Sequence, residues 1–432
     1  MDFKSFKLHN RVQSGIESEG YAIPTPIQAK AIGPIMEGRD LMGLAQTGSG
    51  KTAAFVLPIL DRLMVGKMGH PRALVIAPTR ELAEQIHQAV ESLGRHTRTR
   101  SMTVYGGVGI NPQVQKMKRG VDVVVGCPGR ILDHLNRGTL DVSGLEILVL
   151  DEADHMFDMG FLPDIKRILA RLPQKRQTLL FSATMPKEVE TLTRKVLVDP
   201  VEVCIDAGRP AKSVRHALFP VHQRQKTAAL MQILKDTGDG PVLVFTRTKH
   251  RAKKLGMQLS AAGYKAAALQ GNLSQIKRQA ALDGFRSGRF RVLVATDIAA
   301  RGIDVARVSH VINYDMPDTT DAYIHRIGRT GRAAYSGEAF TLFTNEDQHM
   351  VRAIDRVLGG KVERRLLKGL DGRLDAALAV EPRLPSGGSA SPGRRKWADQ
   401  KTQGKRKPRP HNGRQGVKSP ILGPEIMRAL RS

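Results

Sequence analysis

The segment 45–52 reads AQTGSGKT and carries the residue types that hold a nucleoside triphosphate. Gly48 and Gly50 let backbone N–H groups turn inward around phosphates at the start of a helix. Lys51 would then reach the β- and γ-phosphates, and the Thr52 hydroxyl would bind Mg²⁺. The usual pattern has glycine at its first position, where this chain has Ala45, and the alternative interpretation is a glycine-rich surface turn. The predicted nucleotide-binding residues of this loop are Ala45, Gln46, Thr47, Gly48, Ser49, Gly50, Lys51 and Thr52.

A cluster of acidic residues could supply the Mg²⁺ ligand and the base that a phosphate-binding loop needs for hydrolysis. The apolar run 147–150 leads directly into Asp151, Glu152, Ala153 and Asp154. Asp151 is placed to hold Mg²⁺, and Glu152 is placed to polarise an attacking water. Acids that cap the next helix are the alternative. The combination with the glycine–lysine–threonine loop favours a nucleoside triphosphatase.

Strand-like and helical segments alternate around these motifs, as in a parallel α/β protein. The apolar runs predict strands that are buried on both faces. The polar segment 206–213 separates two series of such runs, so we expect two consecutive α/β domains. The expected strands are 40–44, 73–77, 121–125, 147–150 and 178–181 in the first series and 242–245, 292–295, 311–313 and 339–343 in the second, with a helix over 53–60.

The amino-acid composition limits the kinds of protein and binding partner that are possible. The 432 residues include 68 Lys and Arg against 41 Asp and Glu, a formal charge of +27, which favours a polyanion such as nucleic acid or an acidic membrane surface. A hydrophobic fraction of 41% excludes a wholly disordered chain. Two cysteines are too few for a disulfide framework or a cysteine metal site. With no long apolar run and no signal-like start, the expectation is a cytoplasmic, nucleic-acid-associated protein.

The C-terminal segment has a different composition. From 383 to 432 there are 13 Lys or Arg, two acids and a single aromatic residue, Trp397. Such a segment cannot bury enough apolar surface to form a core, so a disordered basic tail is expected. The expected boundaries are 1–206 for the first domain, 207–213 for the linker, 214–368 for the second domain and 369–432 for the tail.

At this point the sequence resembles the DEAD-box ATP-dependent RNA helicases, whose name is the tetrad at 151–154. The resemblance covers about residues 1–365, and segments 110–113 and 244–250 look like the bacterial RhlE-type branch. It implies two tandem RecA-like domains with parallel sheets, an RNA-dependent ATPase that uses ATP and Mg²⁺, and local unwinding of short RNA duplexes or remodelling of RNA–protein complexes. The chemistry would take place in a cleft between the domains.

The resemblance also assigns roles to single residues. Gln28 in the segment 20–28 would read adenine while Phe3 stacks on the base, and Asp304 would contact the ribose. A structural turn with Phe3 as a core anchor is the alternative. Ser182 and Thr184, together with Asp154 and His325, would couple hydrolysis to strand separation. Arg329 and Arg332 would act as arginine fingers. From the residues themselves, the capping residues Asp318 and Thr319 predict a helix through 325–332 with His325 and both arginines on one face, and a solvated basic face is the alternative.

The implied RNA groove consists of loops at strand ends and helix starts, which hold the sugar–phosphate backbone and therefore read little sequence. One departure stands at Cys127, where the family usually has threonine, because a thiol is a poor donor to phosphate. The expected RNA-binding residues are Thr79, Arg80, Gly106, Gly107, Pro128, Gly129, Arg130, Gly271, Gln275, Arg278, Thr296 and Asp297.

Two rival functions are a DNA-directed translocating helicase and an RNA chaperone that works through its tail without an ATPase. The intact acids, lysine and arginines argue against the chaperone, and the adenine motif with DEAD and Ser-Ala-Thr argues against the DNA enzyme. Ribosomal precursor particles and the RNA-decay machinery are candidate partners, and a monomer is the expected active unit.

Overall fold

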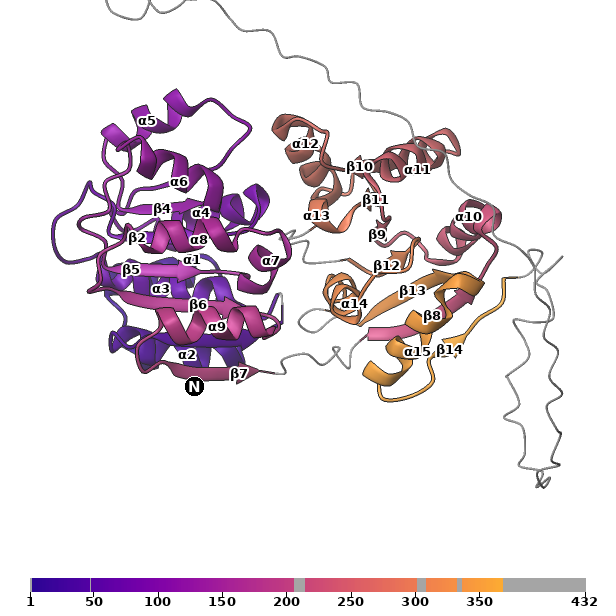
Figure 1. Cartoon of the computed structure of the whole chain (residues 1–432), viewed down its shortest axis with the longest axis horizontal. Coiled ribbons are helices and arrows are strands. Elements are labelled where there is room, and N and C mark those ends of the chain that lie inside the picture. The colour runs from indigo at the N-terminus through magenta and orange to yellow at the C-terminus, as the bar shows by residue number, and fades with distance from the viewer. Residues whose placement is uncertain (1, 47, 206–213, 301–307, 332–335, 368–432) are drawn as a thin grey trace, which may run out of the picture. The chain divides into compact units, whose positions relative to one another are not determined.

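The computed structural model describes residues 2–46, 48–205, 214–300, 308–331 and 336–367. These residues form two seven-stranded sheets in which every paired strand is parallel (Figure 1). The parallel α/β class predicted from the sequence is therefore confirmed. The expected linker, the end of the second domain at 368 and the basic tail lie outside the described residues.

The first sheet has the strand order β3-β4-β2-β5-β6-β1-β7. Helices cover both of its faces, and a separate apolar core fills each side, with α1–α4 on one face and α6–α9 on the other. Two buried faces explain why the central strands are continuous apolar runs. The strands are β1 Leu41–Ala45, β2 Ala73–Ile76, β3 Ser101–Val104, β4 Val123–Gly126, β5 Ile147–Leu150, β6 Gln177–Ser182 and β7 Val201–Ile205. The helices are η1 Phe3–Phe6, α1 Asn10–Ser18, α2 Pro26–Met36, α3 Lys51–Arg62, α4 Arg80–Leu93, α5 Ile110–Lys118, α6 Pro128–Asn136, α7 Ala153–Asp158, α8 Leu162–Leu169 and α9 Lys187–Val196.

Pairing in this sheet sets the position of the predicted motifs. Strand β6 lies between β1 and β5, with Ser182 opposite Leu44 and Leu180 opposite Leu150. The carboxyl ends of parallel strands meet at one edge of a sheet, which is where ligands bind in open α/β folds. The phosphate loop, the Ser-Ala-Thr segment and the acidic tetrad therefore follow three neighbouring strands at that edge.

The second sheet has the order β10-β11-β9-β12-β13-β8-β14 and is likewise packed on both faces. Its strands are β8 Val214–Pro220, β9 Val242–Phe245, β10 Ala266–Leu269, β11 Val292–Ala295, β12 His310–Asn313, β13 Gly337–Phe343 and β14 Glu363–Arg364. Its helices are η2 Gln223–Gln225, α10 Lys226–Asp236, α11 Lys249–Ala261, α12 Gln275–Arg286, α13 Asp297–Ala300, α14 Thr320–Ile327, η3 Asn345–Asp347 and α15 Gln348–Val357.

One helix prediction was wrong in its extent. The sequence suggested a helix through 332, but α14 begins after the N-cap Thr319 and ends at Ile327, with Gly328 as its C-cap. Gly331 then takes a left-handed φ of 66°. Arg329 therefore follows the helix and does not share a helical face with His325.

Among the described residues, no helix is both long and apolar enough to cross a membrane.

Candidate functional site

The phosphate loop connects the fully buried strand β1 to the start of α3 at Lys51. Gly48 and Gly50 have φ values of 83° and 95°, which side chains other than glycine rarely adopt. A Cβ on Gly50 would also lie 2.6 Å from Nε2 of Gln28. The Ser49 hydroxyl is buried and has no hydrogen-bond partner among the described residues, as expected where a ligand supplies one. Ala45 is the last residue of β1, and Thr47 lies outside the described residues.

Lys51 turns back toward the loop that precedes it. Its Nζ donates to the carbonyl of Ala45 at 2.6 Å and to that of Gln46 at 3.0 Å, and only 6% of the residue is exposed. Burial lowers the pKa of Lys51, although the carboxylates of the acidic tetrad partly offset this. A buried ammonium held by two carbonyls is placed to exchange them for phosphate oxygens. Thr52 follows it, half-buried, in the first turn of α3.

Asp151 and Glu152 are both buried at the end of β5. Burial raises the pKa of Asp151 to about 7, in spite of the nearby Lys51 charge. A carboxylate that is costly to ionise here suits a bound cation, which fits the proposed Mg²⁺ ligands Thr52 and Asp151. Burial opposes ionisation of Glu152, but His155 and Arg329 outweigh it and hold the pKa of this carboxyl well below its usual range. Glu152 is therefore ionised, as a base must be.

Asp154 joins the acidic tetrad to the Ser-Ala-Thr segment. Its Oδ2 accepts hydrogen bonds from the backbone N–H of Ala183 at 3.2 Å, and from the backbone N–H and hydroxyl of Thr184, both at 2.9 Å. Its own N–H donates to Ser182 Oγ at 3.2 Å. The structure thus brings three of the four predicted coupling residues together in one network.

Gln28 and Phe3 have intramolecular partners in this structure. Gln28 Oε1 accepts from the N–H of Thr25 at 2.9 Å, while Nε2 donates to the carbonyl of Gly50 at 3.0 Å. Phe3 is 2% exposed and packs against Phe6 and Tyr21. Gln28 thus lies beside the phosphate loop, whereas Phe3 is placed as a core anchor.

Residues of the second sheet reach the acidic tetrad. His325 Nε2 lies 3.6 Å from Asp154 Oδ2, and the buried Arg329 contributes to lowering the pKa of Glu152. The predicted site residues Arg332 and Asp304 lie outside the described residues.

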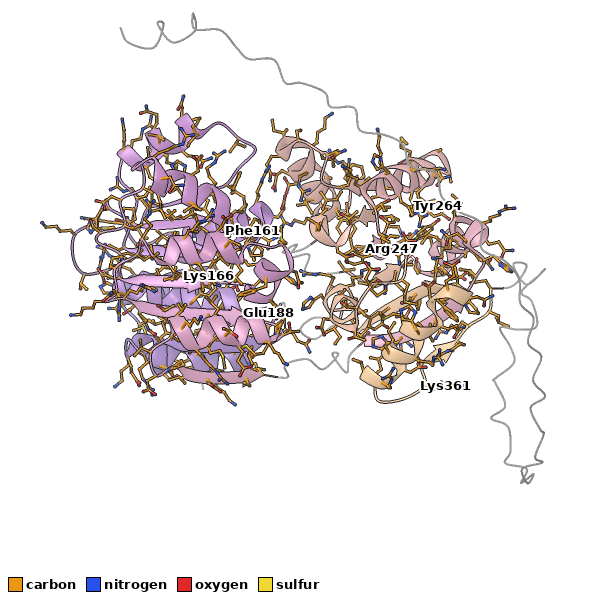
Figure 2. The ribbon with its side chains drawn as sticks, in the orientation of Figure 1. Phe161, Lys166, Glu188, Arg247, Tyr264 and Lys361 are labelled. Carbon is orange, nitrogen blue, oxygen red and sulfur yellow. The ribbon has the colours of Figure 1, made fainter. Side chains whose placement is uncertain are left out.

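Predicted RNA-binding residues from both domains line one cavity of about 620 Å³. Helices α4, α6 and α12 begin beside it, and N-terminal helix N–H groups favour phosphate. Phe161, which precedes α8, adds an aromatic side chain (Figure 2). The predicted residues in its lining are Thr79, Arg80, Gly106, Gly129, Arg130, Gly271 and Arg278.

Two arginines of this cavity are held by backbone and side-chain oxygens. Arg130 donates from both Nη atoms to the carbonyl of Val108 at 3.2 and 3.1 Å. Arg80 Nη1 lies 3.5 Å from Gln275 Oε1, and a Cβ on Gly107 would come within contact distance of the Arg80 guanidinium. Gly107 therefore allows Arg80 to pass close to the backbone.

Asp297 has a structural partner. Its carboxylate accepts two hydrogen bonds from Arg326, at 2.6 and 2.7 Å, and Arg326 also donates to Asn313 and to the carbonyl of Asp315. Neither Asp297 nor the buried Thr296 lines the cavity with its neighbours. These two predicted RNA-binding residues therefore lie outside the lining of the cavity.

Cys127 is the N-cap residue of α6, ahead of Pro128, and its thiol makes no capping hydrogen bond. Burial raises the pKa of this thiol to about 12, so it stays neutral. Position 127 thus lies at the cavity as predicted, but with a weak donor where threonine would present a hydroxyl.

Sequence reasoning missed three residues of this region. His155 contacts Glu152, Glu81 pairs with Arg278, and Arg326 ties Asp297 to the end of β12. The only local signal was for His155, which follows Glu152 by three residues and so faces it across the first turn of α7.

The fold and the site define a class of protein with tandem parallel α/β sheets and a phosphate loop beside an acidic tetrad. The family pattern described as DEAD/DEAH box helicase matches residues 25–192, and the helicase conserved C-terminal domain matches 225–334. The DEAD-box ATP-dependent RNA helicase CshA of Geobacillus kaustophilus is 41% identical over 385 residues, covering 88% of this chain and 82% of that one. The CshA protein of Bacillus subtilis is 39% identical over 379 residues, covering 88% and 76%.

Among solved structures, S. cerevisiae Dbp5 bound to RNA and ADP BeF3 matches with a TM-score of 0.78 and 30% identity, covering 86% of this chain and 97% of that one. The chain belongs to the DEAD-box ATP-dependent RNA helicases, and its two sheets are RecA-like domains. The relatives named above are CshA proteins, so the RhlE-type assignment stays a prediction.

Proposed function

We propose that this RNA-dependent ATPase hydrolyses ATP at the carboxyl edge of the first sheet and holds the RNA backbone in the cavity between α4, α6 and α12. The observation that carries the proposal is the network around Asp154. This residue is bonded to Thr184 and lies near His325, so a change at the nucleotide is transmitted to both sheets. ATP and RNA together would close the site, and hydrolysis would reopen it.

In the chemical step, Glu152 orients and deprotonates the water that attacks the γ-phosphorus, and ADP leaves as the bond to its bridging oxygen breaks. Lys51 binds the β- and γ-phosphates in place of its carbonyl partners. Arg329, together with Arg332, would neutralise charge that develops on the γ-phosphoryl group. Mg²⁺ held by Thr52 and Asp151 would neutralise phosphate charge when bound.

Adenine selection would come from Gln28. Its amide offers one donor and one acceptor, which match the N6/N7 edge of adenine. Binding the base would replace at least one of the present contacts to Thr25 and Gly50. In this account Asp304 contacts the ribose, and stacking of Phe3 on the base would require this buried side chain to leave its packing against Phe6 and Tyr21.

RNA recognition would be independent of sequence. The predicted RNA-binding residues that line the cavity are arginines, glycines and a threonine, which suit phosphate and ribose. Closure of the site on one strand would bend it or pry it from its complement, so short duplexes would be opened locally.

We also propose the domain boundaries 1–206, 207–213, 214–368 and 369–432, and membership of the RhlE-type branch on the basis of the segments 110–113 and 244–250. Ribosomal precursor particles or the RNA-decay machinery are the proposed cytoplasmic partners, with a monomer as the active unit.

The test is ATPase activity with and without single-stranded RNA, for the wild type and for Glu152→Gln. We expect RNA to stimulate the wild type, and Glu152→Gln to bind ATP but to lose about 10²-fold or more in turnover. RNA-stimulated turnover of the variant within a few-fold of wild type would contradict the role of Glu152. Stimulation by duplex DNA as strong as that by RNA would instead favour a DNA-directed enzyme.

A further inference from the structure

His155 links the catalytic carboxylate to the second sheet through two hydrogen bonds. Its ring is 1% exposed, and its Nδ1 lies 2.9 Å from Glu152 Oε2. Its Nε2 lies 2.9 Å from His325 Nδ1, and the two rings meet edge to face, with centroids 4.4 Å apart and planes at 89°.

With both imidazoles neutral, the proton positions along this row of hydrogen bonds follow from counting donors and acceptors. The carboxylate of Glu152 can only accept, so His155 Nδ1 carries a proton and, in the neutral ring, Nε2 accepts. His325 Nδ1 must then donate to His155, which leaves His325 Nε2 without a proton. That nitrogen is buried without a hydrogen-bond partner among the described residues, and it stands 3.6 Å from Asp154 Oδ2, beyond hydrogen-bond distance. Burial and the adjacent imidazole lower the pKa of His325 to about 3, in keeping with a neutral ring.

The orientation of the Glu152 side chain depends on a hydrogen bond from another residue. It is the N-cap residue of α7, and its φ of 52° is in the left-handed region that non-glycine residues rarely adopt. Its buried carboxylate receives a hydrogen bond from His155, while Lys51 and Arg329 act on it through their charge. A buried carboxylate that loses its donor would turn toward another positive group and away from a water.

We propose that His155 is a positioning residue that orients Glu152 toward the attacking water, and that His325 of α14 in the second domain fixes His155 in the tautomer this requires. The inference rests on the proposed function of Glu152 as the base. The orientation of the Glu152 carboxylate then depends on a contact between the two domains. Turnover is fast only when His325 is hydrogen-bonded to His155.

The test compares three replacements of His155 in RNA-stimulated ATPase assays. His155→Asn keeps a donor near the position of Nδ1, His155→Gln moves the amide toward the position of Nε2, and His155→Phe keeps the ring shape with no donor. For a positioned base we expect kcat to fall about 10-fold or more in His155→Phe and His155→Gln, with KM for ATP within about twofold of wild type. His155→Asn should recover most of that loss. A packing role predicts the reverse order, because phenylalanine fills the site better than asparagine.

Coupling provides a second measurement. In a Glu152→Gln background, His155→Phe should not lower the residual kcat further, since the group it orients is already absent. His87→Asn is the matched control and should leave kcat unchanged. This buried histidine of α4 hydrogen-bonds to Ser101 of β3, and its Nε2 lies 3.4 Å from a carboxylate oxygen of Glu91.

The outcomes separate the two claims. If Glu152→Gln turns over like wild type, the proposed function of Glu152 fails. If Glu152→Gln is inactive but His155→Phe has wild-type kcat, or His155→Asn is the slower of the two, the role of His155 is overturned.

Discussion

Arg278 donates from Nε to Glu81 Oε1 at 2.7 Å, and both side chains are largely buried. The pair joins the start of α12 to the start of α4, beside the cavity to which we assign RNA. Gln275 adds a longer contact to the same carboxylate at 3.5 Å. An arginine predicted to bind phosphate is therefore neutralised by a carboxylate when RNA is absent.

Removing that carboxylate should strengthen RNA binding. In Glu81→Gln the Arg278 guanidinium is free to pair with phosphate and a negative charge is gone, so nucleotide-free affinity for single-stranded RNA should rise roughly threefold to tenfold at low salt. Glu91→Gln, an exposed change of the same charge on α4, is the control. Fluorescence anisotropy measures both, and equal or weaker binding by Glu81→Gln would show that the pair does not compete with RNA.

Adenine selectivity is the second expectation. Wild type should hydrolyse ATP and not GTP, and Gln28→Ala should raise KM for ATP about 10-fold through lost hydrogen bonds. Gln28→Glu keeps the acceptor for the N–H of Thr25 but loses the donor, so it distinguishes the contribution of the amide oxygen from that of the amide nitrogen. Thermal melts check that both variants fold. GTP hydrolysis at the wild-type ATP rate would refute this role of Gln28.

Arg329 should act in the transition state. Arg329→Ala should lower kcat by about 10²-fold or more with nucleotide affinity within threefold, because the charge it neutralises develops during transfer. Arg352→Ala, an exposed arginine of α15, is the control. Stopped-flow binding measures nucleotide affinity and steady-state assays measure kcat, so together they distinguish a role in the transition state from a role in binding. An unchanged kcat would leave Arg329 with only a structural role.

The basic tail should act as an RNA tether. If roughly half of the 13 Lys and Arg in 383–432 engage phosphates, deleting this segment should flatten the slope of log K against log salt by about 4 units. Binding should weaken for all RNA sequences alike, while ATPase at saturating RNA survives. An unchanged slope with unchanged affinity at low salt would favour a solubilising or protein-docking tail.

The fold was largely predictable because buried parallel strands are apolar on both faces. The run 147–150 coincides with β5, and 242–245 and 292–295 coincide with β9 and β11. The phosphate loop and the acidic tetrad were recognisable because their spacing places them at the carboxyl ends of β1 and β5. Both features are encoded in short segments of consecutive residues, which can be recognised without knowing the tertiary contacts.

The remaining features depend on contacts between distant segments. The Glu81–Arg278 pair spans 197 positions and the His155–His325 pair spans 170. No local spacing in the sequence could therefore predict either contact. The end of α14 could have been placed from Gly328 and Gly331, since glycine commonly follows the last helical turn. The mistaken helix through 332 came from weighting the spacing of the basic residues above that signal.

The most direct test of the account is strand displacement from a short labelled RNA duplex with a single-stranded extension. We predict displacement by wild type with ATP, little with GTP or without nucleotide, and none above background for Glu152→Gln under multiple turnover. RNA-stimulated ATP hydrolysis without displacement, or displacement at the same rate without ATP, would contradict a helicase driven by hydrolysis at this site.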